Sequence, residues 1–246
     1  MEVLVPEGDP RPDFDALLRA NIPRIEQALY LMHLYGSLGG RSRNGWGSFI
    51  LQPVEGTASL GGRVPFRDWE EALKLDWPHA LGADKADTQG IRPLIWQTQQ
   101  TYTNWEDALR DLARVKVGLR TQLALSGTPA QGAPDRCWLA YPITNHWVAN
   151  WGPNARLPNS LHFKVRPAPD KPQEWVGVIF HMPCSPPKSF QQQKQSIVKT
   201  WKAVHRFLDE LALPDGQRSL SWITNADLQQ QIADLVADVV LKRVQE

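Results

Sequence analysis

Apolar side chains recur at helical spacing in several segments of the chain. In residues 193–211, five of them are separated by four, three, four and three positions, which places them on one face of a helix. They are Ile197, Trp201, Val204, Leu208 and Leu211. Similar apolar faces, with Asn at the first position, predict helices over 21–35, 104–115 and 225–244. A shorter helix is predicted over 67–75.

Short apolar runs between proline-rich and glycine-rich segments predict the strands. They lie at 48–51, 137–143, 160–165 and 176–182. Residues 80–90 are small and polar, and we expect a surface loop there. Helices and strands in this order are typical of an α+β protein whose strands are largely antiparallel.

Residues 38–49 read L-G-G-R-S-R-N-G-W-G-S-F and connect a predicted helix to a predicted strand. A dinucleotide-binding fingerprint has the opposite order, and a phosphate-binding P-loop needs a G-K-[ST] sequence that this segment lacks. A plain connection of about two to six residues needs fewer glycines. The segment, called the glycine loop below, contains Gly39, Gly40, Gly45 and Gly47.

The chemistry of the glycine loop suits phosphate groups. Glycine allows backbone N–H groups to approach a ligand closely, and the guanidinium groups of Arg41 and Arg43 match phosphate oxygens. Ser42, Asn44 and Ser48 add neutral donors, and Trp46 offers a ring on which a base can stack. We interpret the loop as a nucleic-acid backbone site. A structural turn and a site for a small anion remain as alternatives.

Charge is distributed unevenly along the chain. The formal net charge is +1, yet residues 136–207 hold ten Lys and Arg against two acids, which leaves −7 for the remainder. Such a basic block suggests one face that binds a polyanion. Arg156, His162, Lys164 and Arg166 flank or lie on one predicted strand, and the last three share a face of it. A solvent-facing edge strand protected by lysine is the alternative interpretation.

The remaining chemistry-bearing residues do not form a recognisable catalytic or metal-binding motif. His162 or His181 could serve as a general base, but core or edge positions are the preferred interpretation, and we expect no catalysis, metal or cofactor. Trp147 and Trp151 lie in predicted loops, where we expect them to meet partners. The sequence shows no leader and no apolar run of about 20 residues, so we expect a soluble, cytoplasmic protein without membrane contact.

The glycine loop, directly after a helix, resembles that of the RAMP superfamily, the RNA-binding ferredoxin-like (RRM-like) subunits of CRISPR effector complexes. The similarity is closest to the second half of the large end subunit of the type III-B (Cmr) complex, with its G-G-x-G-x-R-S-R-x-G-x-G-S loop. The matching positions are Gly39, Gly40, Arg41, Ser42, Arg43, Gly45, Gly47 and Ser48. Residues 157–165 and 178–183 resemble two strands of that family, so the similarity spans about 21–211.

The resemblance implies one domain over 1–246, with a ferredoxin-like core at about 21–211 and a C-terminal helix at 225–244. It implies a non-catalytic subunit that binds crRNA and assembles with other CRISPR effector subunits. Contact with target RNA is a further expectation. The motifs of the family's first half are absent from this sequence. A split subunit, a fragment and a lone diverged protein each explain that absence, and in the first case a separate chain supplies the missing half.

Two other functions stay open at this point. One is a RAMP-family ribonuclease that processes pre-crRNA with His162 or His181. The other is a structural interaction module that does not bind RNA and in which the glycine loop is only a turn.

Overall fold

The computed structural model describes most of the chain. The described residues are 14–40, 42–52, 54, 60–88, 90–123, 134–144, 146, 148, 151–152, 154–214 and 216–244. Within this part the chain divides into two compact units, and each is described by itself. The first unit comprises Met1–Gly36 and Ile50–Arg63, and the second comprises Ser37–Phe49 and Val64–Glu246.

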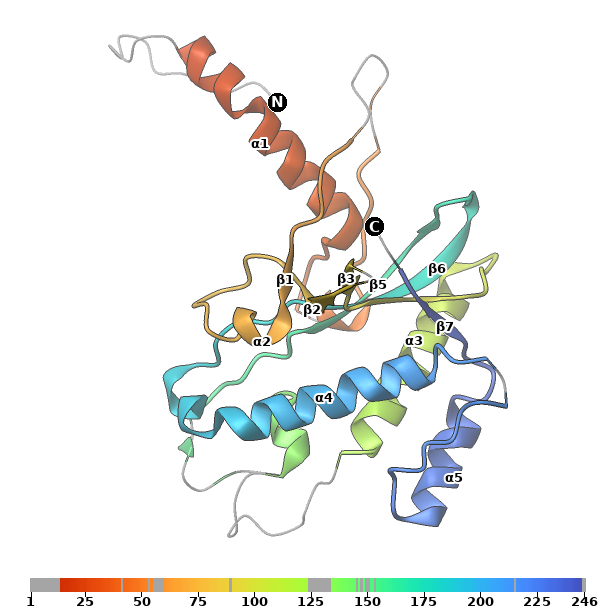
Figure 1. Cartoon of the computed structure of the whole chain (residues 1–246). Coiled ribbons are helices and arrows are strands. Elements are labelled where there is room, and N and C mark those ends of the chain that lie inside the picture. Colours follow the sequence, from red (N-terminus) through yellow and green to blue (C-terminus); the bar gives the residue numbers. More distant parts are fainter. Residues whose placement is uncertain are drawn as a thin grey trace. The chain divides into compact units, whose positions relative to one another are not determined.

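The first unit contains one long helix, α1 (Phe14–Tyr35), drawn in red in Figure 1. The prediction that this helix starts at Asn21 was wrong, because the Asn21 side chain donates to the Leu17 carbonyl at 2.7 Å and Pro23 lies inside the helix. The predicted strand at 48–51 does not form either. The N–H of Leu51 is bonded to Nδ1 of His33 at 3.2 Å rather than to a neighbouring strand.

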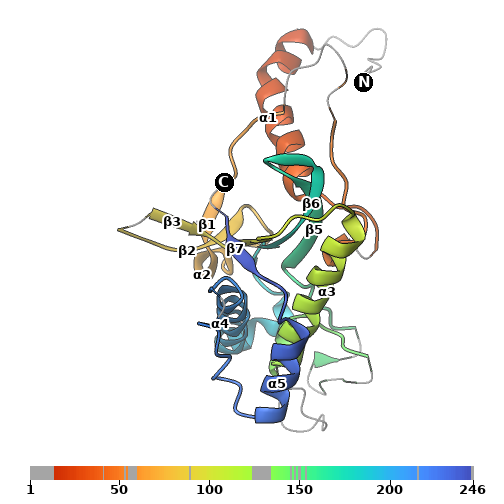
Figure 2. The same cartoon turned by 90° about the vertical axis from the view of Figure 1, so that its right-hand side faces the viewer.

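The second unit is built on a four-stranded antiparallel sheet. In spatial order its strands are β5 (Leu161–Ala168), β6 (Lys171–His181), β4 (Ile95–Thr98) and β7 (Leu241–Arg243). Along the chain, β4 leads through α3 (Trp105–Thr121) to the β5–β6 hairpin, and α4 (Lys194–Glu210) and α5 (Ala226–Leu235) then lead to β7. Figures 1 and 2 show α3, α4 and α5 on the same side of this sheet.

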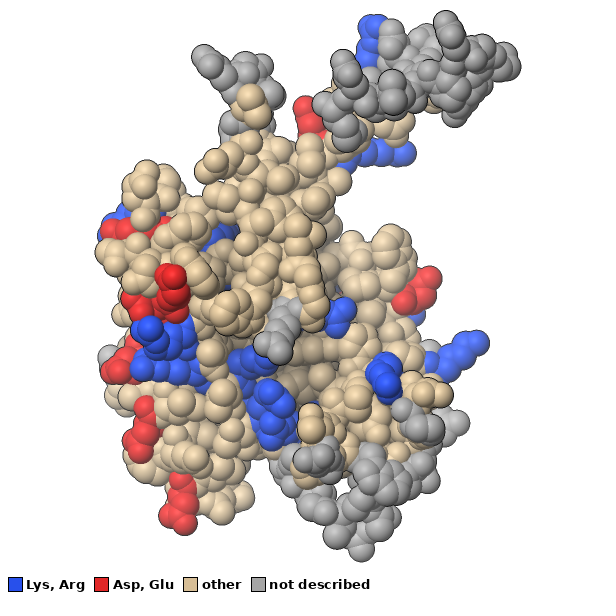
Figure 3. All heavy atoms as spheres, turned by 180° about the vertical axis from the view of Figure 1, so that it is seen from behind, with Lys and Arg blue, Asp and Glu red and all other residues tan. Residues whose placement is uncertain are grey.

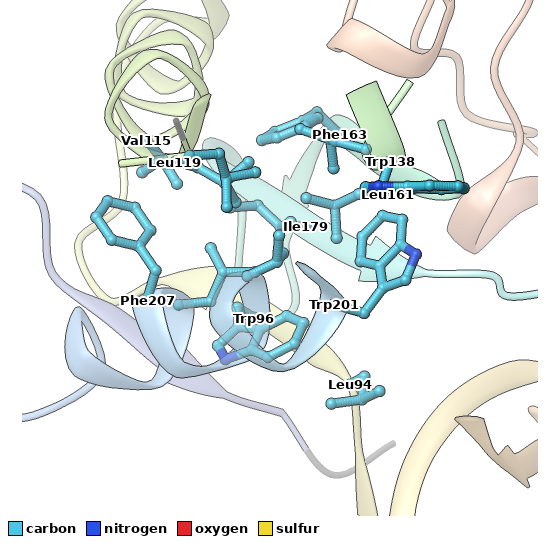
Figure 4. Close-up of a cluster of buried hydrophobic side chains, with 14 of the residues drawn as sticks. Leu94, Trp96, Val115, Leu119, Trp138, Leu161, Phe163, Ile179, Trp201 and Phe207 are labelled. Carbon is cyan, nitrogen blue, oxygen red and sulfur yellow. The ribbon is translucent and has the colours of Figure 1, made fainter. Parts of the chain in front are cut away.

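The hydrophobic core lies between the sheet and these helices. Figure 4 shows Ile179 of β6 among side chains that come from α3, such as Val115 and Leu119, and from α4, such as Trp201 and Phe207. Helix α3 approaches β6 closely at Gly177, where an added Cβ would lie 2.7 Å from a Leu112 side-chain carbon. The apolar stripe predicted for 193–211 is buried along its whole length.

A second, three-stranded sheet lies within the same unit. Its strands are β1 (Phe66–Asp68), β2 (Leu81–Asp87) and β3 (Gly90–Pro93), of which β1 and β2 are parallel. The short helix predicted at 67–75 is α2 (Trp69–Ala72). The loop predicted at 80–90 was wrong, because Leu81, Gly82 and Ala83 are buried strand residues and only the later part of β2 is polar and exposed.

Other predicted elements are partly confirmed. Strands at 160–165 and 176–182 and helices at 104–115 and 193–211 are present as β5, β6, α3 and α4. The predicted strand at 137–143 is replaced by a 3₁₀ helix, η2 (Asp135–Trp138). The helix predicted over 225–244 ends at Leu235, and the residues that follow form β7. Further 3₁₀ helices cover Ser42–Asn44 (η1) and Lys188–Gln193 (η4).

Candidate nucleic-acid interface

The glycine loop is a folded turn within the second unit. Ser37 and Ser48 form an isolated antiparallel bridge, and the N–H of Leu38 donates to the Gly47 carbonyl at 2.9 Å. Between them the N–H of Ser42 donates to the Gly39 carbonyl at 3.2 Å, which opens η1. Backbone hydrogen bonds therefore close the described part of the loop, and the strand predicted to follow it at 48–51 does not form.

The four glycines have two different roles. Gly47 has a φ of +76°, and a Cβ there would lie 1.8 Å from the Leu38 carbonyl oxygen. Gly45 has a φ of +88°, and its Cβ would lie 2.6 Å from a side-chain carbon of Leu109. These two glycines are required for the turn itself. Gly39 has a φ of +95°, so the turn favours glycine there too, but Gly39 and Gly40 both have open space around the Cβ position, and their backbone is accessible to a ligand.

The polar side chains of the loop connect it to β5 and α3. Ser48 Oγ donates to the Gly45 carbonyl at 2.7 Å and accepts the Val165 N–H of edge strand β5 at 3.0 Å. Arg43 is exposed, and its Nη1 donates to the Asn159 carbonyl at 2.9 Å just before β5. Asn44 Oδ1 accepts a hydrogen bond from Lys116 of α3. Ser42 is half-buried, and Arg41 lies outside the described residues.

Trp46 is the exposed aromatic residue of the loop. Its side chain is 54% exposed and makes an edge-to-face contact with Trp105, the first residue of α3, with ring centroids 6.4 Å apart. Trp105 is 42% exposed. Two large rings therefore lie together at the surface, where a base could stack on either of them. By contrast Trp151 is buried in a cluster with Trp138, Tyr141 and Phe190, which corrects the expectation of an exposed ring, and Trp147 lies outside the described residues.

His162, Lys164 and Arg166 share one face of β5, as their alternation predicts, but Lys164 and Arg166 are buried. Lys164 has no exposed surface, and its Nζ lies 5.1 Å from the Phe49 ring centroid. Burial and the nearby Arg166 guanidinium lower the pKa of Lys164 to about 8. Arg166 Nη2 points to Gln97 Oε1 at 3.5 Å. The expectation of a solvent-facing lysine on this strand was therefore wrong.

His162 and Arg156 occupy different surroundings. The His162 ring stacks on Phe180 of β6 at 5.2 Å, and burial together with the charge of Arg43 lowers the pKa of His162 to about 4. Arg156 is exposed, and its Nη1 donates to the Ala155 carbonyl at 2.8 Å. Arg43 and His162 are thus close together.

A concave basic surface next to the loop was missed by the sequence analysis. Lys116 and Arg120 of α3 and Arg136 of η2 line a hollow of about 500 Å³, together with Asn44 of the glycine loop and Asn159. We call this surface the basic hollow. Figure 3 shows Lys and Arg side chains gathered around a hollow on this face of the molecule. The four-residue spacing of Lys116 and Arg120 was visible in the sequence, but Arg136 joins them only through folding.

His181 is enclosed in the core rather than placed at a surface. Its Nε2 lies 3.0 Å from Ser160 Oγ, and its Nδ1 lies 3.0 Å from Nε2 of His205. The His181 ring stacks on Trp201 at 4.1 Å. Burial and the neighbouring histidines lower the pKa of His181 well below its ordinary value, and burial followed by the charge of Arg243 lowers the pKa of His205 to about 3. Both rings are therefore neutral.

Neither a metal centre nor a membrane span is found in the described part of the chain. No group of three or more His, Cys, Asp or Glu side chains there is arranged to hold a metal ion. None of the helices in that part combines the length and the hydropathy needed to cross a bilayer. Comparison with protein-family models, with curated proteins and with solved structures gives no match.

Proposed function

We propose that this chain is a ferredoxin-like, RNA-binding subunit of a type III CRISPR effector complex, which holds crRNA through its glycine loop. The order of the elements supports the fold assignment. The connection β4–α3–β5–β6–α4–β7, with β4 between β6 and β7 in an antiparallel sheet, supports this proposal because the split βαβ fold uses the same order of elements. The small sheet of β1–β3 and helix α5 are additions to that pattern.

One observation carries the RNA-binding proposal, namely the position of the glycine loop beside cationic and aromatic side chains. The accessible backbone at Gly39 and Gly40, the exposed Arg43 and the exposed Trp46 belong to one turn held against β5. Backbone amides and guanidinium groups bind phosphates, and an indole ring stacks on a base. Arg41, Ser42 and Asn44 complete the proposed loop site, and the exposed Arg156 is proposed as an outer contact.

The burial of Lys164 and Arg166 gives them a supporting role in this proposal. Lys164 lies over Phe49 at the end of the glycine loop. Val165, which lies between Lys164 and Arg166 in the sequence, donates its backbone N–H to Ser48 Oγ. We propose that β5 positions the loop while the loop contacts RNA. His162 acts through its position beside Arg43.

We propose binding without cleavage. A ribonuclease that used His181 would need that ring at the surface, whereas the ring is fully buried and bonded on both sides. His162 is largely buried, and its lowered pKa of about 4 makes it a weak base. The structural-module alternative has one supporting observation, because the turn alone explains the glycines at Gly39, Gly45 and Gly47, which all have a positive φ.

Replacing both Arg41 and Arg43 by alanine is expected to weaken single-stranded RNA binding. Log K falls as log[salt] rises, and each phosphate contact adds about 0.7 to the steepness of this fall. The double change should therefore make the fall less steep by about 1.4. Fluorescence anisotropy of a labelled RNA at several salt concentrations measures the slope.

The matched control is Lys74→Ala/Lys202→Ala, which also removes two exposed cations. Lys74 is paired with Glu71 at 2.7 Å and Lys202 with Glu70 at 3.0 Å, so neither is needed for phosphate binding in the proposal. An Arg41/Arg43 variant with the same salt slope as wild type would leave the loop as a turn only. Copurification from the native host, with sequencing of bound RNA, tests the CRISPR assignment directly.

A further inference from the structure

The basic hollow concentrates positive charge that the described residues do not neutralise. No carboxylate lines it in the described part of the chain, and none there forms an ion pair with Lys116, Arg120 or Arg136. Asp135, the acid next to Arg136 in the sequence, is instead paired with Lys199 at 3.1 Å. Such an arrangement attracts an anion because three like charges surround one concave space.

The three cations also repel one another. Burial lowers the pKa of Lys116, with the charge of Arg120 adding to the effect. Burial and the charge of Arg136 lower the pKa of Arg120. The Nε of Arg136 is itself buried and has no hydrogen-bond acceptor among the described residues. A bound phosphate would relieve the repulsion and satisfy guanidinium donors at the same time.

An aromatic groove adjoins the basic hollow. A second concavity, of about 510 Å³, is lined by Trp46 and Trp105 and by Leu109 of α3. Asn44 and Lys116 line both concavities, so the two adjoin each other along α3. The groove also contains Glu106 and Arg110, of which Arg110 is paired with Asp107. Exposed rings beside a cationic channel are the arrangement that single-stranded nucleic-acid binding uses.

We infer that α3 carries a second nucleic-acid site, in which a single strand crosses the helix with a phosphate in the basic hollow and a neighbouring base on the Trp46–Trp105 pair. This inference rests on the proposed RNA-binding function and extends it from the glycine loop to α3. Asn44 joins the two sites, since it belongs to the loop and bonds to Lys116. The chemistry read by this site is the sugar–phosphate chain and a stacked base, so little preference for base sequence is expected.

Two double variants separate the phosphate contact from the stacking contact. Lys116→Gln/Arg120→Gln should lower the salt slope for single-stranded RNA by about 1.4, one contact being worth about 0.7. Trp46→Ala/Trp105→Ala should weaken binding roughly 5- to 150-fold, as expected for one lost stacked base, with no change in the salt slope. Labelled oligo(U), oligo(dT) and a blunt RNA duplex serve as probes in anisotropy titrations, with Lys74→Gln/Lys202→Gln as the charge-matched control.

Folding is checked in the same experiment by thermal unfolding of each variant. Replacing Lys116 and Arg120 by glutamine removes their repulsion but also alters the hydrogen bond from Lys116 to Asn44, and because these effects oppose each other we expect Tm to stay close to that of wild type. A lowered Tm would indicate that the two side chains stabilise the fold, and would overturn the inference. Single-strand binding that exceeds duplex binding supports it, and equal binding of the two contradicts it.

The outcomes distinguish the inference from the proposed function. If the Arg41/Arg43 variant loses affinity while the Lys116/Arg120 variant, which leaves the loop residues unchanged, matches the control, the inference fails and the loop proposal stands. If the Lys116/Arg120 variant loses affinity while the Arg41/Arg43 variant does not, the phosphate contact of the loop fails and the α3 site stands. A wild-type protein that binds none of the probes overturns both.

Discussion

Replacing Gly47 by alanine is expected to open the glycine loop. The residue has a φ of +76°, where a Cβ costs about 1–2 kcal/mol, and that Cβ would lie 1.8 Å from the Leu38 carbonyl oxygen. The backbone must therefore move, and the total cost should reach about 3 kcal/mol or more. Because the loop can open without unfolding the sheet, the loss should appear first as local opening.

Amide hydrogen exchange measures this opening. The N–H of Leu38 donates to the Gly47 carbonyl at 2.9 Å, so its protection reports directly on loop closure. A cost of about 3 kcal/mol corresponds to exchange roughly 100-fold faster, and RNA affinity should fall with it if the closed loop is the binding form.

Gly40→Ala is the matched control for Gly47→Ala. Gly40 has open space around its Cβ position, and its φ lies outside the left-handed region. Its replacement should change loop closure by less than about 0.5 kcal/mol. Equal exchange rates in the two variants would show that the loop is not held by the turn described above.

Mild acid is expected to destabilise the protein through its buried histidine pair. Burial holds the folded-state pKa of His205 at about 3 and that of His181 well below its ordinary value of 6.5. Between these values the unfolded chain binds more protons than the folded chain. The free energy of unfolding therefore falls as pH falls below about 6.5, by up to about 1.4 kcal/mol per pH unit for each histidine. His162 adds to the effect down to about pH 4.

Urea unfolding at pH 7.5, 6.5, 5.5 and 4.5 measures this dependence. In His205→Gln the free energy of unfolding should fall less steeply between pH 6.5 and 5, because one proton fewer is taken up on unfolding. The variant is also expected to be less stable at pH 7.5. His79→Gln is the control, because His79 is exposed and lies 3.3 Å from Asp76 at the surface. A slope that is the same in His205→Gln and in wild type would mean that His205 is not held neutral in the fold.

The parts of the fold that the sequence predicts are those with strong local patterns. Helix α3 begins after Asn104, whose side chain accepts the Asp107 N–H at 2.9 Å as its capping pattern indicates. Helix α4 carries an unbroken apolar stripe, and β5 and β6 are long enough for their positions to be recognised in the sequence. In these elements the local pattern and the tertiary environment agree.

The missed elements are short and depend on tertiary contacts. Strand β4 has only four residues, all of them buried, so no alternation marks it. Strand β7 has three and follows a helical pattern that continues past Leu235. The apparent cap at Asn21 misled because an early proline is typical of helix starts, yet α1 continues through Pro23.

The candidate site shows the same division. The glycine loop and its donor residues are visible in twelve consecutive letters. The burial of Lys164 and the meeting of Arg136 with α3 are not, because they depend on which segments fold against each other. Charge counted along the sequence pointed to residues 136–207, whereas the basic hollow takes two of its three cations from outside that block.

Strand β7 determines when the main sheet can be completed during synthesis. Strand β4 is paired on one side with β6 and on the other with β7, where Trp96 is opposite Arg243 and Thr98 is opposite Leu241, although most of the chain lies between these two strands in the sequence. Until β7 has been made, β4 remains an open edge to which another chain could add a strand. Once β7 is paired, Arg243 forms ion pairs with Asp84 of β2 and with Asp209 of α4. This one residue, made late in synthesis, therefore links the main sheet to the smaller sheet and to α4.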